Sequence, residues 1–279
     1  MKYNPLLLPL VLLCMFTSGC DRKTKTITIA GSTTVLPVVS RAAEHFKSVE
    51  KLRIIVNAGG SGVGINQLGE GKVDIGMASR EITESEINQY PDVQFVTHAI
   101  GKDAVVPVVS SEIHATGVHA LSLDQIGKIY QGKILNWKEL GGPDREILVI
   151  DKEKSRGTRH VFMQIVLGDK YAKAPGADLA LGSNNEEQTA IVQSDSAIGM
   201  LSHAWLNQDI KALSIRTLDG GVITASTKNI IDGTFPITRQ LYLITNGQPQ
   251  GETKAFIGFI LSPAGQKIVA ESNYVSIIQ

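Results

Sequence analysis

The sequence contains very little cysteine, with Cys14 and Cys20 the only two in 279 residues. Both lie in a leader-like segment at the start of the chain. If Cys14 is removed with that segment, no disulfide can form within the mature chain, and the fold has to rest on a hydrophobic core. A hydrophobic content of 43% over this length is enough for one large core or for two domains.

The sequence also lacks an excess of charge and of aromatic side chains. Its 27 basic and 27 acidic residues cancel, which indicates no polybasic face for nucleic acid or for lipid headgroups. Aromatic residues make up 5% of the chain, which argues against a stacking platform for bases or sugars. We therefore expect no nucleic-acid partner.

The apolar run at the start of the chain, Pro5 to Phe16, is too short to span a bilayer. With Lys2 before it and three small residues after it, the run has the layout of a secretory signal, so we expect an exported protein. Cys20 follows directly, and the site resembles a bacterial lipoprotein signal in which residues 1–20 end at a lipidated cysteine. Thr17 stands where that pattern usually has leucine, so simple secretion is the alternative.

Three segments of the chain share one pattern: a strand, a loop rich in glycine and hydroxyl side chains, and a helix. Strands are expected near residues 26–30, 53–57 and 146–150, and the helices after them reach residues 48, 69 and 167. The intervening loops carry Ser32, Thr33, Thr34, Ser61, Gly62, Gly157 and Thr158. The first backbone N–H groups of a helix have no partner within the helix and attract anions. Three such helix tips suggest one shared oxyanion.

A fourth expected strand, residues 73–77, leads into Ser79 and Arg80. Arginine suits a tetrahedral oxyanion because its fork makes paired hydrogen bonds, although an exposed arginine at a helix start is the alternative. Strands alternating with helices imply an α/β fold with a mostly parallel sheet and helices on both faces. In such sheets the ligand lies beyond the carboxyl ends of the strands.

Residues 104–109 form an apolar run whose proline, Pro107, would interrupt a central strand ladder. We therefore expect the chain to cross between two domains here and to cross back over residues 236–244. The terminal helices, over residues 253–270, return to the first domain. Two crossings place the pocket between two lobes that close around a ligand by hinge bending.

The glycine and histidine patterns match no catalytic, metal or cofactor motif. The glycine cluster at residues 59–64 has neither the lysine of a phosphate-binding loop nor the last glycine of a dinucleotide fingerprint. Ser61 lacks the final glycine of a hydrolase elbow. The six histidines are scattered through the sequence. We expect no cofactor, no metal and no enzymatic activity.

Four pieces of the chain, in order, are similar to one family, the phosphate-binding proteins of bacterial phosphate ABC transporters. They cover residues 31–37, 59–64, 73–80 and 157–159, and a tail piece covers residues 265–269 followed by 274–275. The resemblance implies an α/β, two-lobed type II periplasmic binding protein fold with a ligand cleft between the lobes. With the two expected crossings, residues 26–104 and 240–279 form lobe I and residues 108–236 form lobe II.

The resemblance also implies the site residues and the partners. Phosphate would be bound by Ser32, Thr33, Thr34, Ser61, Gly62, Ser79, Arg80, Gly157 and Thr158, and we add Arg156 as a hypothesis of our own. The protein would be an exported monomer, held at the cell envelope through Cys20, that delivers phosphate to ABC permease subunits. Receptors for sulfate or arsenate, and a ligand sensor that signals to a membrane receptor, are the alternatives.

Three positions depart from the family pattern. Arg80 stands where some members have an aspartate that accepts the proton of monohydrogen phosphate, and Arg156 replaces a small hydroxyl residue. The family arginine four positions before Arg156 is matched here by Lys152. Our hypothesis is that Arg156 makes the paired contact that Lys152 cannot make.

Overall fold

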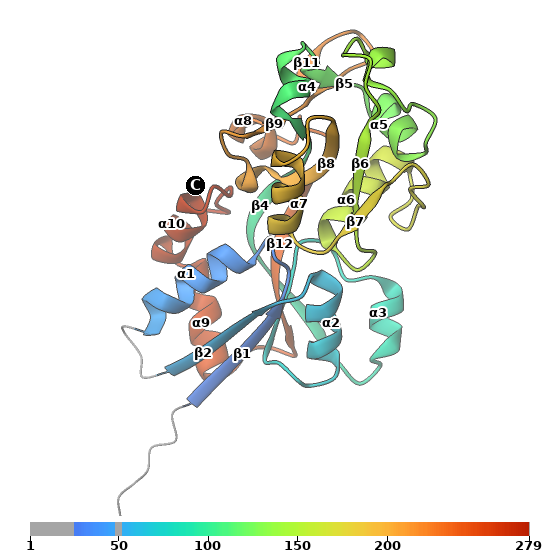
Figure 1. Cartoon of the computed structure of the whole chain (residues 1–279). Coiled ribbons are helices and arrows are strands. Elements are labelled where there is room, and N and C mark those ends of the chain that lie inside the picture. The colour runs from blue at the N-terminus through green and yellow to red at the C-terminus, as the bar shows by residue number, and fades with distance from the viewer. Residues whose placement is uncertain (1–24, 48–51, 279) are drawn as a thin grey trace, which may run out of the picture.

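The computed structural model describes residues 25–47 and 52–278, so the expected export signal and Cys20 lie outside the described residues. Within these residues no helix is both long and apolar enough to cross a membrane. Figure 1 shows two groups of helices and strands, one above the other, with the long strands β4 and β12 running between them.

The first group follows the strand, loop and helix order expected from the sequence. Its strands β1, β2 and β3 are parallel and adjacent in the order β2-β1-β3. The elements are β1 (Lys25–Gly31), α1 (Leu36–Lys47), β2 (Leu52–Ala58), α2 (Ser61–Gly69), β3 (Ile75–Ala78) and α3 (Glu84–Gln89). The C-terminal helices α9 (Gly251–Leu261) and α10 (Pro263–Glu271) pack beside α1.

The two groups are joined by β4 (Phe95–Ser110) and β12 (Thr238–Asn246), which pair with each other antiparallel. The sequence predicted a separate crossing segment at 104–109, whereas this run is part of the single long strand β4. Pro107 does not interrupt the ladder, because the strand on one side of β4 changes at this point. Strand β12 pairs with β4 as far as Ala104, and β9 (Ile210–Ala212) pairs with it from Val108 onward. Its missing N–H therefore leaves no strand partner unsatisfied.

The second group repeats the parallel arrangement, because β6 pairs parallel with both β7 and β8. Its larger elements are α5 (Leu123–Tyr130), β6 (Leu148–Lys152), α6 (Gly157–Leu167), β7 (Leu179–Leu181), α7 (Asn184–Val192) and β8 (Ala197–Ser202). Its smaller ones are α4 (Ser111–Ala115), β5 (Ala120–Leu121), β10 (Ser214–Arg216), β11 (Val222–Ile223), α8 (Thr227–Ile231) and the 3-10 turns η1 (Trp137–Leu140) and η2 (His203–Trp205).

The main sheet is mixed, where the sequence predicted a mostly parallel one. Its strand order is β2-β1-β3-β12-β4-β8-β6-β7, and β12 and β4 run antiparallel to their neighbours. Strand β4 runs from the first group into the second, and β12 runs from the second group back into the first, so both are antiparallel to the strands beside them. The parallel strands on either side still direct their carboxyl ends toward the junction of the two groups.

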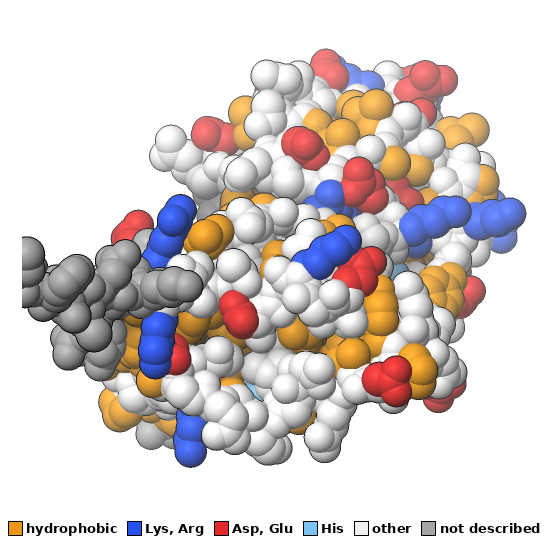
Figure 2. Space-filling model, turned by 90° about the horizontal axis from the view of Figure 1, so that it is seen from below, with side chains coloured by type: hydrophobic (Ala, Val, Ile, Leu, Met, Phe, Trp, Pro, Cys, Tyr) orange, Lys and Arg blue, Asp and Glu red, His pale blue; other side chains and the backbone are white. Residues whose placement is uncertain are grey.

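Two large hydrophobic clusters form the core. The apolar stripe of α1 and of the turn before it is buried, with Val35, Val38, Val39 and Ala42 fully inaccessible to solvent. This stripe packs with strands β1 to β3 and with α9 and α10. The other cluster fills the second group and contains its largest buried side chains, including Trp137. Figure 2, which views the molecule from below, shows acidic and basic side chains interspersed on that face.

Candidate functional site

A small hollow of about 200 Å³ lies where the loops of the two groups meet. It is lined by Ser32, Thr33, Thr34, Gly60, Ser61, Ser79, Lys152, Arg156, Gly157, Thr158, Gly182 and Asn184. Eight of the ten residues predicted to bind the ligand are in this set, and the other two, Gly62 and Arg80, are not. The predicted loops therefore converge, although they are far apart in the sequence.

The loop after β1 is fixed by hydrogen bonds to its own helix and to β3. Ser32 Oγ accepts from the Thr34 backbone N–H at 3.2 Å, within the turn that leads into α1. The Ser32 backbone N–H donates to the Met77 carbonyl at 2.9 Å. Gly31 has a φ of +140°, and a Cβ there would lie 2.2 Å from the Met77 oxygen. A glycine is thus required for the loop to approach β3 this closely.

The other two helix tips face each other across the hollow. Helix α2 begins at Ser61 and α6 at Gly157, and no side chain caps either end. A Cβ on Gly157 would lie 2.4 Å from Ser61 Oγ, so the two tips are in contact. The Gly62 backbone N–H donates to the Ser155 carbonyl at 3.1 Å. Gly62 therefore joins the two groups directly instead of lining the hollow.

Arg80 points away from the hollow, although Ser79 beside it lines the hollow. Its guanidinium donates to both carboxylate oxygens of Glu86, at 2.7 and 2.8 Å, and to the Glu81 carbonyl. Burial acts to raise the pKa of the Glu86 carboxyl, but the Arg80 hydrogen bond and charge outweigh it and hold that pKa below its usual value. Paired in this way, the fork that suggested an anion ligand is already occupied.

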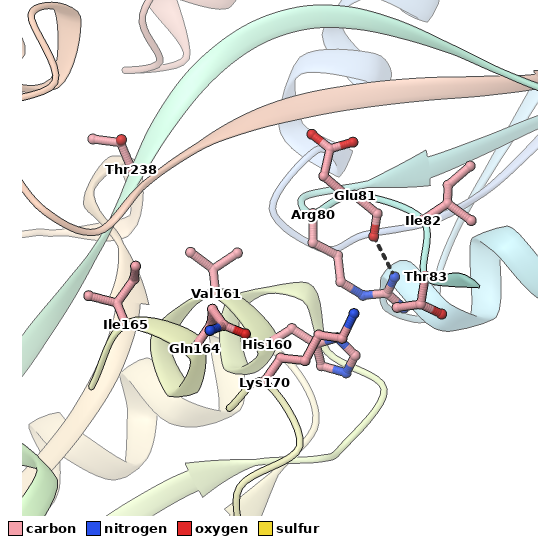
Figure 3. A pocket seen from close by; sticks show the side chains of 10 residues that line it. All are labelled: Arg80, Glu81, Ile82, Thr83, His160, Val161, Gln164, Ile165, Lys170 and Thr238. Atoms are coloured by element: carbon pink, nitrogen blue, oxygen red, sulfur yellow. Dashed lines mark hydrogen bonds between the residues drawn. The ribbon is translucent and has the colours of Figure 1, made fainter. Parts of the chain in front are cut away.

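The face of the loop that carries Arg80 lines a second pocket, with an empty volume of about 550 Å³ (Figure 3). Residues Arg80–Thr83 form one wall, and the other wall comes from α6 and Lys170. His160 is buried there and hydrogen bonds through Nε2 to the Lys154 carbonyl at 2.8 Å. Burial and the nearby Arg80 charge lower the pKa of His160 to about 4.

Two cations line the hollow from the second group, and each already has a carboxylate partner. Lys152 is buried and pairs with the buried Glu187, and its Nζ donates to Asn184 Oδ1 at 3.2 Å. Burial raises the pKa of Glu187 in spite of this partner. Arg156 donates through Nε to Glu153 at 2.8 Å and is 15% exposed.

Arg239, on β12, was missed by the sequence analysis. It is 7% exposed and donates to Asp103 on β4 through Nε and Nη2, at 2.8 and 2.6 Å. Burial acts to raise the pKa of Asp103, but the Arg239 charge and the His203 hydrogen bond hold it below its usual value. The one available signal was an arginine inside the segment predicted to cross between lobes.

Arg239 reaches the floor of the hollow and touches both groups. Its Nη1 donates to Thr158 Oγ1 at 2.9 Å and to Ser79 Oγ at 3.3 Å, and its Nη2 donates to Thr34 Oγ1 at 3.3 Å. Asn184 Nδ2 also donates to Thr34 Oγ1, at 3.2 Å. Asn184 and Gly182 are further lining residues that the sequence analysis missed.

The lining residues are hydroxyl, amide, backbone N–H and cationic groups, and no carboxylate is among them. Such a cavity favours a small oxyanion, which accepts several hydrogen bonds at once. Across residues 25–47 and 52–278, no group of three or more His, Cys, Asp or Glu residues is arranged to hold a metal ion.

Comparison with known proteins agrees with this geometry. The family model described as a PBP superfamily domain matches residues 17–264. The chain is 33% identical to the phosphate-binding protein PstS of Bacillus subtilis over 262 residues, which is 93% of this chain and 83% of that protein. It is 28% identical to PstS of Borreliella burgdorferi over 91% of this chain and 90% of that protein.

Solved structures give the same result. A Clostridium perfringens protein solved with bound phosphate superposes with a TM-score of 0.81 and 32% identity, over 91% of this chain and 100% of that one. An ABC-type phosphate transport receptor from Vibrio cholerae has a TM-score of 0.70 and 31% identity, over 89% and 99%. The chain therefore belongs to the PBP superfamily and, within it, to the family of phosphate-binding proteins of ABC transporters, and it has their two-lobed α/β fold.

Proposed function

We propose that the protein binds one inorganic phosphate in the hollow and delivers it to an ABC-type importer. The observation that carries this proposal is the convergence of hydroxyl groups and two uncapped helix N-termini on a hollow without a lining carboxylate. Helix N-termini and hydroxyls are favourable partners for phosphate oxygens. The names of the relatives, PstS and phosphate transport receptor, support the same ligand.

The proposed ligand groups come from both lobes. From lobe I they are Ser32, Thr33, Thr34, Ser61 and Ser79, and from lobe II they are Arg156, Gly157 and Thr158. We leave out Gly62, whose N–H donates to Ser155, and Arg80, whose two terminal nitrogens pair with Glu86 and which lines the second pocket instead of the hollow. We add Arg239 as the cation beneath the site. A hydrogen bond to a charged group contributes about 1.5–3 kcal/mol, so a handful is sufficient for micromolar binding.

The proposed lobes keep the limits predicted from the sequence, 26–104 with 240–279 and 108–236. The two main hydrophobic clusters support this division, since one packs around β1 to β3 and the other around β6 and β8. Because the two crossing strands join them, the lobes can open and close by bending at β4 and β12.

The remaining parts of the proposal concern location and partners. The protein is exported, as expected for its family, and is held at the cell envelope by a lipid on Cys20. It acts as a monomer that docks on ABC permease subunits. It has no enzymatic activity, so a generic phosphomonoester should not be hydrolysed in its presence.

The test is calorimetric titration of residues 21–279, after unfolding and refolding to remove carried ligand, with phosphate and then with sulfate. We expect one phosphate per chain. Thr158→Val should weaken binding about tenfold or more, because it removes one hydroxyl donor to the anion. Thr97→Val, on an exposed part of β4, is the matched control and should bind normally. Equal binding of sulfate, or no phosphate binding, would overturn the proposal.

A further inference from the structure

Two histidines of the second group face each other at its surface. His114 lies in α4 and is partly exposed, and His119 lies just before β5 and is exposed. His119 Nδ1 lies 3.1 Å from His114 Nε2, and the two ring centroids are 4.2 Å apart. Figure 1 shows α4 and β5 at the top of the second group, whereas the first group lies below it. The pair is therefore separate from the hollow, which lies where the two groups meet.

The backbone holds both histidines in place. Gly117, with a φ of +102°, reverses the chain between them, and its N–H donates to the His114 carbonyl at 3.1 Å. The His119 carbonyl accepts from the first N–H of β10 at 3.0 Å. Ile113 and Val118, the residues just before the two histidines, are buried in the core of the second group. The main chain of the pair is thus anchored, although its rings reach solvent.

The two facing nitrogens have a separation that suits a chelated metal ion. In a hydrogen bond between two imidazoles, one nitrogen carries the proton and the other offers a lone pair. A metal ion can replace this shared proton when each ring keeps its own proton on its other nitrogen. Two bonds of about 2.05 Å to a tetrahedral ion place their nitrogens about 3.3 Å apart. The observed 3.1 Å is close to this value, so chelation requires only a small turn of the rings.

The groups around the pair indicate which kind of ion it suits. Within residues 25–47 and 52–278 no third His, Cys, Asp or Glu joins it, which is why the sequence showed no metal motif. The cation that acts on His114 is Lys211 on β9, and the Lys211 ammonium donates to the Gln208 carbonyl at 2.6 Å. Ca²⁺ and Mg²⁺ take oxygen ligands, so two imidazoles do not suit them. Imidazole nitrogens suit copper, nickel and zinc.

We propose that His114 and His119 form a surface site for one divalent transition-metal ion, with Cu²⁺ bound more tightly than Ni²⁺ or Zn²⁺. The two rings supply two ligands, and water fills the remaining positions. Because the site is open and its histidines are already held together by the backbone, the ion binds reversibly and the fold does not depend on it. The site is independent of the proposed function.

The experiment is calorimetric titration of the untagged chain, residues 21–279, with Cu²⁺, Ni²⁺, Zn²⁺ and Mg²⁺ chlorides at pH 7.5. This chain contains no cysteine, so thiolates cannot bind the ions. We expect one Cu²⁺ per chain, weaker binding of Ni²⁺ and Zn²⁺, and none of Mg²⁺. His114→Gln and His119→Gln should each weaken Cu²⁺ binding about tenfold or more, since each removes one of the two ligands. His45→Gln, at an exposed position in α1, is the matched control and should keep the wild-type affinity.

Thermal unfolding without metal verifies that each variant is folded, and phosphate affinity should be the same in His119→Gln as in the wild type. Absence of Cu²⁺ binding would overturn the inference. So would binding that both His114→Gln and His119→Gln retain at wild-type strength, or a loss in His45→Gln as large as theirs, because these results indicate scattered surface histidines. None of these outcomes bears on phosphate, so the proposed function is tested separately.

Discussion

At the scale of single residues, Arg156 lies between Gly60 of proposed lobe I and Gly182 of proposed lobe II. A Cβ on Gly60 would lie 2.9 Å from Arg156 Cδ, and one on Gly182 would lie 2.8 Å from its Nη2. The arginine therefore fills the space between these two glycines at the edge of the hollow. Lys152 lies deeper, where its charge is compensated by Glu187.

Arg156→Ala should lower phosphate affinity about tenfold or more, since it removes a charged donor from the edge of the site. Its stability should change little, because the Glu153 carboxylate it leaves is half exposed and stays hydrated. Lys152→Ala should behave in the opposite way and cost about 3 kcal/mol of stability, because it leaves Glu187 buried and unpaired. Calorimetry and urea unfolding of both variants test this. A small affinity loss in Arg156→Ala and a large one in folded Lys152→Ala would reject the hypothesis that Arg156 makes the paired contact that Lys152 cannot make.

His160 predicts a pH dependence of stability. Its pKa is about 4 in the folded chain and 6.5 for an unperturbed histidine, so the unfolded state binds more protons between these values. Stability is therefore complete above pH 6.5 and falls as the pH drops toward 4. Urea unfolding should show about 2 kcal/mol less stability from this residue at pH 5 than at pH 7.5.

Replacing the histidine separates its effect from that of other groups. His160→Gln should reduce the loss of stability on acidification, and Thr97→Val, which alters no titratable group, should leave it unchanged. A loss that is the same in all three proteins would show that the pKa of His160 is not lowered in the folded state.

At the scale of elements, the predictable parts of the fold were those set by neighbouring residues. The three strand, loop and helix units were predicted because their apolar spacing and loop hydroxyls lie within about twenty residues of each other. Strands β5, β9 and β11 were not predicted, since two or three residues carry no periodic signal and the strands are held by distant partners.

The site also depends on contacts between residues that lie far apart in the sequence, and these could not be predicted. Arg239 pairs with Asp103 from 136 positions away, and Asn184 reaches Thr34 from 150 positions away. No local pattern encodes such contacts. The partner of Arg80 was within reach of the sequence, because Glu86 follows six residues later and closes a capping box with Thr83 at the start of α3.

The close packing of α2 on the sheet can be tested by substituting a glycine of α2. A Cβ on Gly64 would lie 2.6 Å from the Ala30 oxygen and 2.9 Å from the Met77 oxygen, both backbone atoms that cannot move aside. Gly64→Ala should therefore cost about 2–3 kcal/mol in urea unfolding. Gly258→Ala, at an exposed position in α9 with open space around it, is the control and should stabilise by up to about 1 kcal/mol. Equal stability of the two variants would contradict this packing.

At the scale of the whole molecule, the structure has its two proposed lobes in contact. Contacts between them include the Gly62 N–H with the Ser155 carbonyl and Asn184 with Thr34, and Arg239, which lies between the lobe limits, bonds to both Thr34 and Thr158. The hollow is formed by loops from both sides, so it exists as a complete cavity only when the lobes are together. Ligand binding and closure should therefore be coupled.

Gly157→Ala should prevent this closure. Its Cβ would lie 2.4 Å from Ser61 Oγ and 2.6 Å from Ser79 Oγ, and both of these side chains are buried and hydrogen bonded. Because the clash arises only when the lobes meet, stability of the unliganded chain should change by less than about 1 kcal/mol. Phosphate affinity should fall about a hundredfold, since the ligand groups of one lobe are lost.

Small-angle X-ray scattering measures the same coupling directly. The radius of gyration of the wild-type chain and of Gly258→Ala should decrease when phosphate is added, and that of Gly157→Ala should stay at its unliganded value. If Gly157→Ala instead compacts on adding phosphate and binds it with wild-type affinity, the contact between the α2 and α6 tips is not part of the bound state. The hollow would then form with the lobes further apart, and the groups of lobe I would have to hold the anion by themselves.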